Sequence, residues 1–204
     1  MDAMAQPLLY FIRHGETDWN VEGRLQGQHD TPLNKVGLGQ AVRCGDILRA
    51  LLARDGRDAQ DFDYVASPLS RARKTMELVR TELALAPTDY RTDARLVELS
   101  FGRWEGFTYA ELKAREPDVL ALAAREHGKW AFVPPGGESY ADLLVRVSAW
   151  HATVTRDTVV VAHGGVARTL IVHFGVEPTA AAPVHGIEQG VVYSFAPGLL
   201  LRFA

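Results

Sequence analysis

Four basic residues follow three short apolar segments of the chain, and they are Arg13, His14, Arg71 and His163. A guanidinium pairs with two phosphate oxygens at once, and a neutral imidazole can attack phosphorus. The chain carries a formal net charge of -3, so a local group of four basic side chains needs an anionic ligand to offset their mutual repulsion. The chemistry indicated is phosphoryl transfer, with one histidine attacking phosphorus and the other three groups binding phosphoryl oxygens.

The same reaction needs a carboxylic acid that protonates the departing oxygen and later activates water. Glu98 is predicted for this role because it follows a segment with strand character and precedes a glycine-bounded loop, and Glu16 is the second choice. Glycines stand beside the two histidines, at Gly15, Gly164 and Gly165. They are predicted to let the backbone approach the ligand, and the helix after the last of them to aim N–H groups at it.

The rest of the chain alternates between patterns typical of strands and of helices. Strands are predicted at 8–12, 64–66 and 158–162, helices at 33–52, 70–83, 139–154 and 166–174, and a terminal hairpin at 191–195 and 199–203. Alternation of this kind predicts an α/β fold class: a three-layer α/β/α sandwich, with a mostly parallel central sheet and helices on both faces. The carboxyl ends of parallel strands meet at one edge of the sheet, so the basic residues are expected to meet there.

The stretch 103–137 lacks a predicted strand and is expected to form a small helical cap beside the sheet. Thr108 and Glu111 have the spacing of a capping box, for a short helix that ends before Pro117. No internal repeat or linker divides the sequence. Residues 1–204 are therefore predicted to form a single domain that carries the cap as an insertion.

The composition is that of an ordinary globular protein, with 47% hydrophobic and 23% charged residues. The net charge gives no general attraction to nucleic acid or to an anionic membrane. Cys44 is the only cysteine, which excludes an intrachain disulfide and suits a reducing compartment. The first apolar run is too short for a signal peptide, and no run approaches the roughly 20 residues of a membrane-spanning helix. A cytoplasmic protein is expected.

Together the motifs resemble those of the histidine phosphatase superfamily, also called the phosphoglycerate mutase-like family. The resemblance rests on Arg13-His14-Gly15-Glu16-Thr17, Arg24-Leu-Gln-Gly27, Thr31-Pro-Leu33, Ser67-Pro-Leu-Ser-Arg71-Ala72, Gly102-x-Trp104-Glu105-Gly106 and His163-Gly164-Gly165. They occur in the family's order and span most of the chain. The resemblance implies that His14 is the phosphohistidine nucleophile and that Glu98 is the proton donor.

The resemblance also implies ligands for the substrate. Arg13, Arg71 and His163 match the residues that bind the phosphoryl group, and a further set matches positions that usually touch substrate or phosphate: Asn20, Gln26, Gly27 and Gly164. The family uses no metal, and no cofactor is expected. A metal site built from His14, His163 and Glu98 is disfavoured because the flanking arginines would repel a cation.

Two enzyme activities share this apparatus. The family's mutases carry an asparagine where this chain has Gly165, a tyrosine where it has Phe101, and a longer basic insertion after the glutamate. Hydrolysis of small phosphomonoesters, by a phosphomonoesterase of the histidine acid phosphatase type, is therefore predicted, with phosphoglycerate mutase as the alternative.

A non-catalytic phosphate-binding module is the remote third reading, since such a module would usually have lost one of the central groups. The expected partner is a small phosphorylated metabolite, with no nucleic acid and no membrane. A homodimer is compatible with the sequence, which does not identify the substrate.

Overall fold

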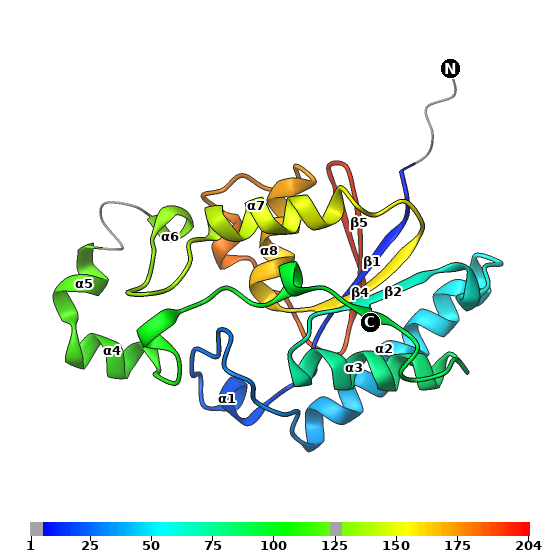
Figure 1. Cartoon of the computed structure of the whole chain (residues 1–204), viewed down its shortest axis with the longest axis horizontal. Coiled ribbons are helices and arrows are strands. Elements are labelled where there is room, and N and C mark those ends of the chain that lie inside the picture. The colour runs from blue at the N-terminus through cyan, green and yellow to red at the C-terminus, as the bar shows by residue number, and fades with distance from the viewer. Residues whose placement is uncertain (1–5, 123–127) are drawn as a thin grey trace.

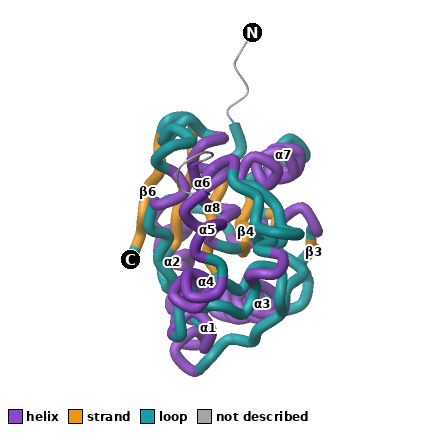
Figure 2. Tube along the Cα trace, turned by 90° about the vertical axis from the view of Figure 1, so that its left-hand side faces the viewer, coloured by secondary structure: helices purple, strands orange, loops and turns teal. Residues whose placement is uncertain are grey.

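A central six-stranded sheet organises the computed structural model, which describes residues 6–122 and 128–204. Its strand order is β3-β2-β4-β1-β5-β6, and Figure 1 labels the four middle strands. The strands are β1 (Leu9–Arg13), β2 (Asp63–Ala66), β3 (Arg91–Thr92), β4 (Thr158–Ala162), β5 (Val192–Ala196) and β6 (Leu199–Phe203). The first four run parallel to one another, whereas β5 is antiparallel to β1 and to β6. Figure 2 shows β3 and β6 at opposite edges.

Helices cover both faces of this sheet. On one face lie α2 (Lys35–Arg54) and α3 (Ser70–Glu82), and on the other α7 (Tyr140–His151) and α8 (Gly164–His173). The other α-helices of the described residues are α1 (Asp18–Val21), α4 (Tyr109–Arg115), α5 (Pro117–Leu122) and α6 (Gly128–Ala131). Successive strand residues point to opposite faces. Leu9 and Phe11 therefore join the core under α7 and α8, while Tyr10 and Ile12 join the core over α2 and α3. The predicted three-layer α/β/α architecture is confirmed.

Local signals fix where several helices begin. The Asn34 side chain accepts a hydrogen bond from the Gly37 amide at 2.9 Å and caps α2. The predicted capping box at Thr108 is present at the start of α4. A second capping box joins Ser139 to Asp142 at the start of α7. Side chains that bond the free amides of a first turn stabilise a helix start, which is why these boundaries were readable in the sequence.

The stretch predicted to form a cap contains three short helices among its described residues. Helices α4, α5 and α6 lie at one end of the molecule, beside the layered core (Figure 1). Residues 123–127 of the predicted cap lie outside the described residues. No helix of the described residues has both the length and the apolar character needed to cross a bilayer.

Two parts of the sheet region differ from expectation. Residues 96–99, whose pattern allowed an extended segment, form no strand: a 3₁₀ turn covers Ala94–Leu96, Val97 has an extended backbone, and the chain that follows has no regular structure. The two-residue strand β3 was not predicted, because both of its residues are exposed and carry no apolar pattern. It forms at the sheet edge by parallel pairing with β2.

Candidate active site

The two predicted catalytic histidines meet at the carboxyl edge of the sheet. His14 follows β1 and His163 follows β4, and these strands are neighbours in parallel register. The His14 amide donates to the carbonyl of Ala162 at 2.9 Å, which continues the strand pairing up to the site. The imidazole centroids lie 5.1 Å apart, and both rings are buried.

One ring nitrogen of His14 is fixed by the backbone. Its Nδ1 lies 2.7 Å from the carbonyl oxygen of Gly15. A carbonyl can only accept, so Nδ1 carries the proton and Nε2 keeps its lone pair. Burial, and then the charges of Arg71 and Arg13, hold the pKa of His14 well below its ordinary value of 6.5. The geometry and the charges both favour a neutral imidazole with a free nucleophilic nitrogen.

The two arginines are held by carbonyl groups instead of carboxylates. Arg13 donates to the Ile187 carbonyl at 2.7 Å, and Arg71 donates to the carbonyls of Gly27 and His29 at 2.8 and 2.7 Å. The ion pairs found within 4.0 Å among the described residues belong to other side chains. No carboxylate within this distance therefore neutralises the positive charges of Arg13 and Arg71.

Among the described residues, five buried side-chain nitrogens have no hydrogen-bond partner; two belong to Trp104 and Trp150, and the other three belong to the basic residues of the site. Arg13 Nε, Arg71 Nε and His163 Nδ1 are buried and find no hydrogen-bond acceptor among the described residues. The other nitrogen of His163, Nε2, lies 2.7 Å from the Ser67 hydroxyl. Burial, followed by the charge of Arg71, holds the pKa of His163 well below 6.5. Unsatisfied buried donors are rare in native proteins, and a tetrahedral anion between these groups would satisfy them.

Glu98 lies against the start of α8. Its Oε1 accepts the Leu99 amide at 2.8 Å and its Oε2 accepts the Gly165 amide at 3.0 Å. Burial lowers the pKa of both Arg13 and Arg71, and the negative charge of Glu98 opposes that effect in each case. The carboxylate therefore belongs electrostatically to the same cluster.

Glu16, the second choice for the acid, is engaged elsewhere. Its carboxylate accepts the Asn34 side-chain amide at 2.9 Å at the start of α2. Glu98 stays the better candidate.

The glycine predictions need correction. The first turn of α8 does not offer the Gly165 amide to a ligand, because Glu98 takes it. A side chain at Gly165 would overlap the Glu98 carboxylate, and one at Gly15 would overlap the carbonyl of Gly37 in α2. These two glycines permit close packing within the protein. Only Gly164 borders the arginines, since a Cβ there would lie 3.7 Å from Arg13 Nε.

The other residues predicted to contact the substrate form hydrogen bonds with protein groups near the basic residues. Asn20 Oδ1 accepts the Thr17 amide at 3.1 Å within the capping box of α1. The Gln26 Oε1 accepts the Thr31 hydroxyl at 2.6 Å. Gly27 has a φ of +51° and presents its carbonyl to Arg71. Substrate contacts by these residues stay a prediction.

Several contributing residues were not predicted from the sequence. Gln189 lies in the loop before β5 and donates to the His14 carbonyl at 3.1 Å and to Asn20 Oδ1 at 3.0 Å. Ser67 orients His163. Ser67 is the first residue of the Ser67-Pro-Leu-Ser-Arg71 motif, but the sequence did not indicate its contact with His163. Nothing in the sequence around Gln189 indicates its contact, which depends on tertiary folding.

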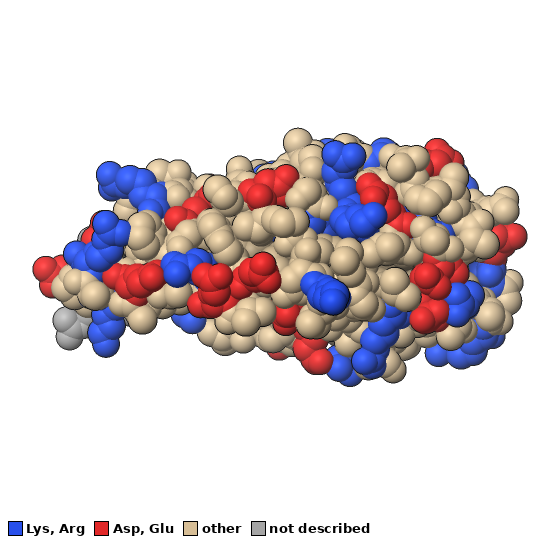
Figure 3. Space-filling model, turned by 90° about the horizontal axis from the view of Figure 1, so that it is seen from below, with Lys and Arg blue, Asp and Glu red and all other residues tan. Residues whose placement is uncertain are grey.

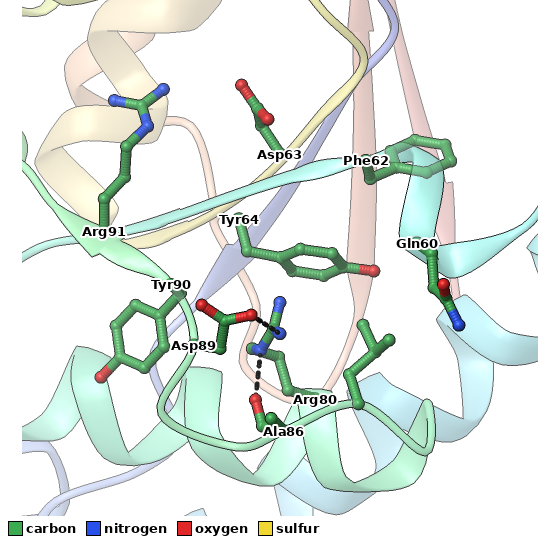
Figure 4. A pocket seen from close by; sticks show the side chains of 10 residues that line it. Gln60, Phe62, Asp63, Tyr64, Arg80, Ala86, Asp89, Tyr90 and Arg91 are labelled. Carbon is green, nitrogen blue, oxygen red and sulfur yellow. Dashed lines mark hydrogen bonds and ion pairs between the residues drawn. The ribbon is translucent and has the colours of Figure 1, made fainter.

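A cavity of about 640 Å³ lies elsewhere, beside β2, β3 and α3. Figure 4 shows the side chains that line it, and none of the predicted catalytic residues is among them. Arg80 is already engaged there: its Nε donates to the Ala86 carbonyl at 2.9 Å, and its guanidinium lies 4.4 Å from the Tyr64 ring centroid. This cavity is separate from the candidate active site.

The described part of the chain gathers no group of three or more His, Cys, Asp or Glu side chains suited to a metal ion. Metal independence stays a prediction for an activity measurement.

The pattern of the Histidine phosphatase superfamily (branch 1) matches residues 9–195 of the sequence. The chain belongs to this superfamily. A member from Mycobacterium tuberculosis, named glucosyl-3-phosphoglycerate phosphatase, is 35% identical over 191 residues, which are 87% of this chain and 79% of the relative. A 2,3-bisphosphoglycerate-dependent phosphoglycerate mutase of Azorhizobium caulinodans is 32% identical over 172 residues, 80% of this chain and 79% of the mutase.

Solved structures agree with this membership of the superfamily. The native structure of a mycobacterial glucosyl-3-phosphoglycerate phosphatase superposes with a TM-score of 0.75 at 33% identity, over 92% of this chain and 89% of that one. An alpha-ribazole phosphatase from Shigella flexneri gives a TM-score of 0.75 at 27% identity, over 92% of this chain and 89% of that one.

Proposed function

We propose that this member of the histidine phosphatase superfamily hydrolyses small phosphomonoesters through a covalent phosphohistidine at His14. The observation that carries the proposal is the hydrogen bond from His14 Nδ1 to the Gly15 carbonyl. It leaves Nε2 as the free nucleophile inside a buried group of cations. Arg13, Arg71 and His163 supply the unpaired donors for three phosphoryl oxygens.

The reaction proceeds in two transfers. His14 Nε2 attacks phosphorus, a P–N bond forms, and the P–O ester bond breaks while Glu98 gives its proton to the departing alcohol. Water then attacks the phosphohistidine and Glu98 takes a proton from it. The P–N bond breaks, inorganic phosphate leaves, and His14 returns to its neutral form. The arginines bind the charge that accumulates on the phosphoryl oxygens in both steps.

Phosphoglycerate mutase is the second candidate, since one relative carries that name. The packing at Gly165 supports the phosphatase instead. A side chain at this position would overlap the Glu98 carboxylate, so the asparagine expected of a mutase would displace the proposed acid. The relative named as a phosphatase also covers more of this chain than the mutase does, at higher identity.

The test is turnover together with covalent labelling. The wild-type protein should hydrolyse p-nitrophenyl phosphate and carry an acid-labile phosphoryl group after rapid quenching with labelled substrate, with or without EDTA. His14→Ala should lose labelling and at least about 10⁴-fold in kcat, because the nucleophile is gone. His173→Ala, an exposed histidine at the end of α8, is the matched control and should behave as wild type.

Two results would contradict the proposal. Full activity in His14→Ala would remove the nucleophile assignment. Conversion of 3-phosphoglycerate to 2-phosphoglycerate in the presence of 2,3-bisphosphoglycerate, faster than phosphate release, would establish the mutase.

A further inference from the structure

A second cavity, of about 290 Å³, lies between α8 and the cap segment. Five of its lining side chains are aromatic, and two are cations, Lys129 and Arg168. The described residues that line it include no aspartate or glutamate. The cavity is therefore apolar on its walls and positive in charge, and its size is that of a small metabolite group rather than of a large ligand.

Arg168 connects this cavity with the proposed phosphoryl site. It lies one turn into α8 after Gly164, and a Cβ on Gly164 would be 3.3 Å from Arg168 Nη1 and 3.7 Å from Arg13 Nε. Arg168 Nε donates to the His185 carbonyl at 3.0 Å, which holds the side chain in place. Among the described residues no carboxylate lies within ion-pair distance of it.

Leu99, which lines the cavity, follows the proposed acid directly in the chain, and its amide donates to the Glu98 carboxylate at 2.8 Å, so the cavity borders Glu98 as well. Burial raises the pKa of the Tyr140 hydroxyl to about 12, with Glu98 adding to the rise and Arg168 opposing it. The charges of Glu98 and Arg168 thus both act on this cavity-lining hydroxyl. Glu98 is the group that would protonate the departing alcohol, so the alcohol part of a substrate must lie on this side of the phosphoryl group.

Stacked ring pairs contribute to the aromatic walls: Trp104 and Phe132 both line the cavity, and Tyr140, which also lines it, is stacked on Trp130. Trp130 stacks on Tyr140 at a centroid distance of 5.6 Å and 16°, and Trp104 stacks on Phe132 at 5.2 Å and 28°. Stacked pairs present flat faces that lose little side-chain freedom when a ligand binds. Flat apolar faces suit the C–H face of a ring better than a flexible chain.

We propose that this cavity holds the alcohol part of the substrate, and that this part is a ring bearing a second anionic group that Arg168 binds. The second anion is a carboxylate or a phosphate. The inference rests on the proposed phosphatase function and adds the substrate class to it. Arg168 is the specificity-determining residue, because its guanidinium is the charged group that lies between this cavity and the proposed phosphoryl site.

The experiment compares cleavage of the C1 phosphate, followed by the sugar product formed, in three sugar phosphates: glucose 1-phosphate, glucuronic acid 1-phosphate and glucose 1,6-bisphosphate. In the wild type, kcat/KM should be at least about 10-fold higher for one or both doubly charged compounds, since charge-assisted hydrogen bonds to arginine contribute on that scale. Which of the two is preferred distinguishes carboxylate from phosphate. Arg168→Met should reduce the ratio to about one, and Arg168→Lys should retain part of it.

The ratio is the readout because a general loss of activity cancels in it. Arg91→Met, which removes an exposed arginine beside the separate cavity of Figure 4, is the matched control and should keep the ratio. Lys129→Met, at an exposed position on the rim, should lower the ratio by a smaller factor and replaces Arg168→Met if that variant does not fold.

A wild-type ratio near one, an unchanged ratio in Arg168→Met, or an equal loss in Arg91→Met would overturn this inference while leaving hydrolysis intact. Absence of turnover with every compound, together with absence of His14 labelling, would instead overturn the proposed function. Calorimetric binding of the same three compounds to wild type and to Arg168→Met then still measures the preference for a second anion.

Discussion

Both carboxylate oxygens of Glu98 accept backbone amides, one from Leu99 and one from Gly165. The carboxyl group is thereby fixed in position without a positively charged side chain bonded to it. A carboxyl group fixed in this way has the defined position that proton transfer to a departing alcohol, and later from water, requires. The contribution of Glu98 to the reaction rate should be larger for substrates with poorer leaving groups, because these need protonation to depart.

Glu98→Gln should therefore act selectively. Turnover of alkyl phosphates should fall by about 10²- to 10⁴-fold, whereas p-nitrophenyl phosphate should be much less affected, because nitrophenolate departs without protonation. Paired kcat measurements on the two substrate types give the answer. Equal slowing of both would indicate a structural role, and Glu16→Gln, which alters the carboxylate at the start of α2, serves as the control.

The two buried histidines should also couple folding to pH. Burial and the arginine charges lower the pKa of His14 and of His163 below 6.5. In the unfolded chain each would bind a proton near pH 6.5, while the folded protein keeps both neutral. Their contribution to stability is therefore complete above about pH 6.5 and is lost as the pH falls toward the lowered pKa values.

Nuclear magnetic resonance titration of the histidine ring signals measures this directly, with His14→Asn to assign one signal. The rings of His14 and His163 should stay neutral well below pH 6.5, and urea unfolding should show lower stability at pH 5.5 than at pH 7.5. Titration of both rings with the ordinary histidine pKa of 6.5 would contradict the buried, positively charged environment described for them.

At the scale of elements, α7 holds the chain around Glu98. Arg146 of α7 donates to the carbonyls of Arg95, Val97 and Glu98 at 2.6, 2.7 and 3.0 Å. It also forms a bidentate ion pair with Glu138 at 2.7 and 2.8 Å. The segment has no regular structure of its own, so one arginine provides much of its hydrogen bonding.

Arg146→Met should both destabilise the protein and misplace the acid. Three carbonyls and one carboxylate would lose their donor, which should lower the free energy of unfolding by about 2–4 kcal/mol. Arg156→Met removes an exposed ion pair with Asp63 and should cost only about 0–1 kcal/mol. In the folded Arg146→Met protein, alkyl phosphates should slow more than p-nitrophenyl phosphate. Unchanged selectivity would make Arg146 a stability residue alone.

Element prediction succeeded where a signal was local. The apolar strands and the capping box at Thr108 were predicted from neighbouring residues, and the structure confirms them. The caps at Asn34 and Ser139 are equally local. Prediction failed where tertiary contacts decide the conformation. The irregular 96–99 segment is held by α7, and β3 exists only through its pairing with β2.

For the whole molecule, the layered fold and the meeting of the strand ends followed from strand–helix alternation alone. The four basic residues do converge, because β1 and β4 are neighbours and α3 begins beside them. What the sequence could not supply was the reason for Gly15 and Gly165, whose partners Gly37 and Glu98 lie far along the chain. The hydrogen bond from Gln189 to the His14 carbonyl could not be predicted for the same reason, because the two residues lie far apart in the chain.

Net charge is equally uninformative about the site. Lys and Arg are interspersed with Asp and Glu over the face of the molecule seen in Figure 3. The cations that matter are interior: Arg71 is 0% exposed, and the Nε of Arg13 is buried. A net formal charge of -3 is thus compatible with a group of buried cations inside the molecule.

The contact between Gly15 and Gly37 sets a limit for anyone redesigning this scaffold. A methyl group on either residue would overlap backbone of the other segment, so the loop that follows β1 rests directly on the first turn of α2. Libraries that vary position 37, which looks like an innocuous helix surface in sequence, would shift the imidazole. Gly39, two residues on, has open space around it and is where diversity can be introduced without disturbing that support.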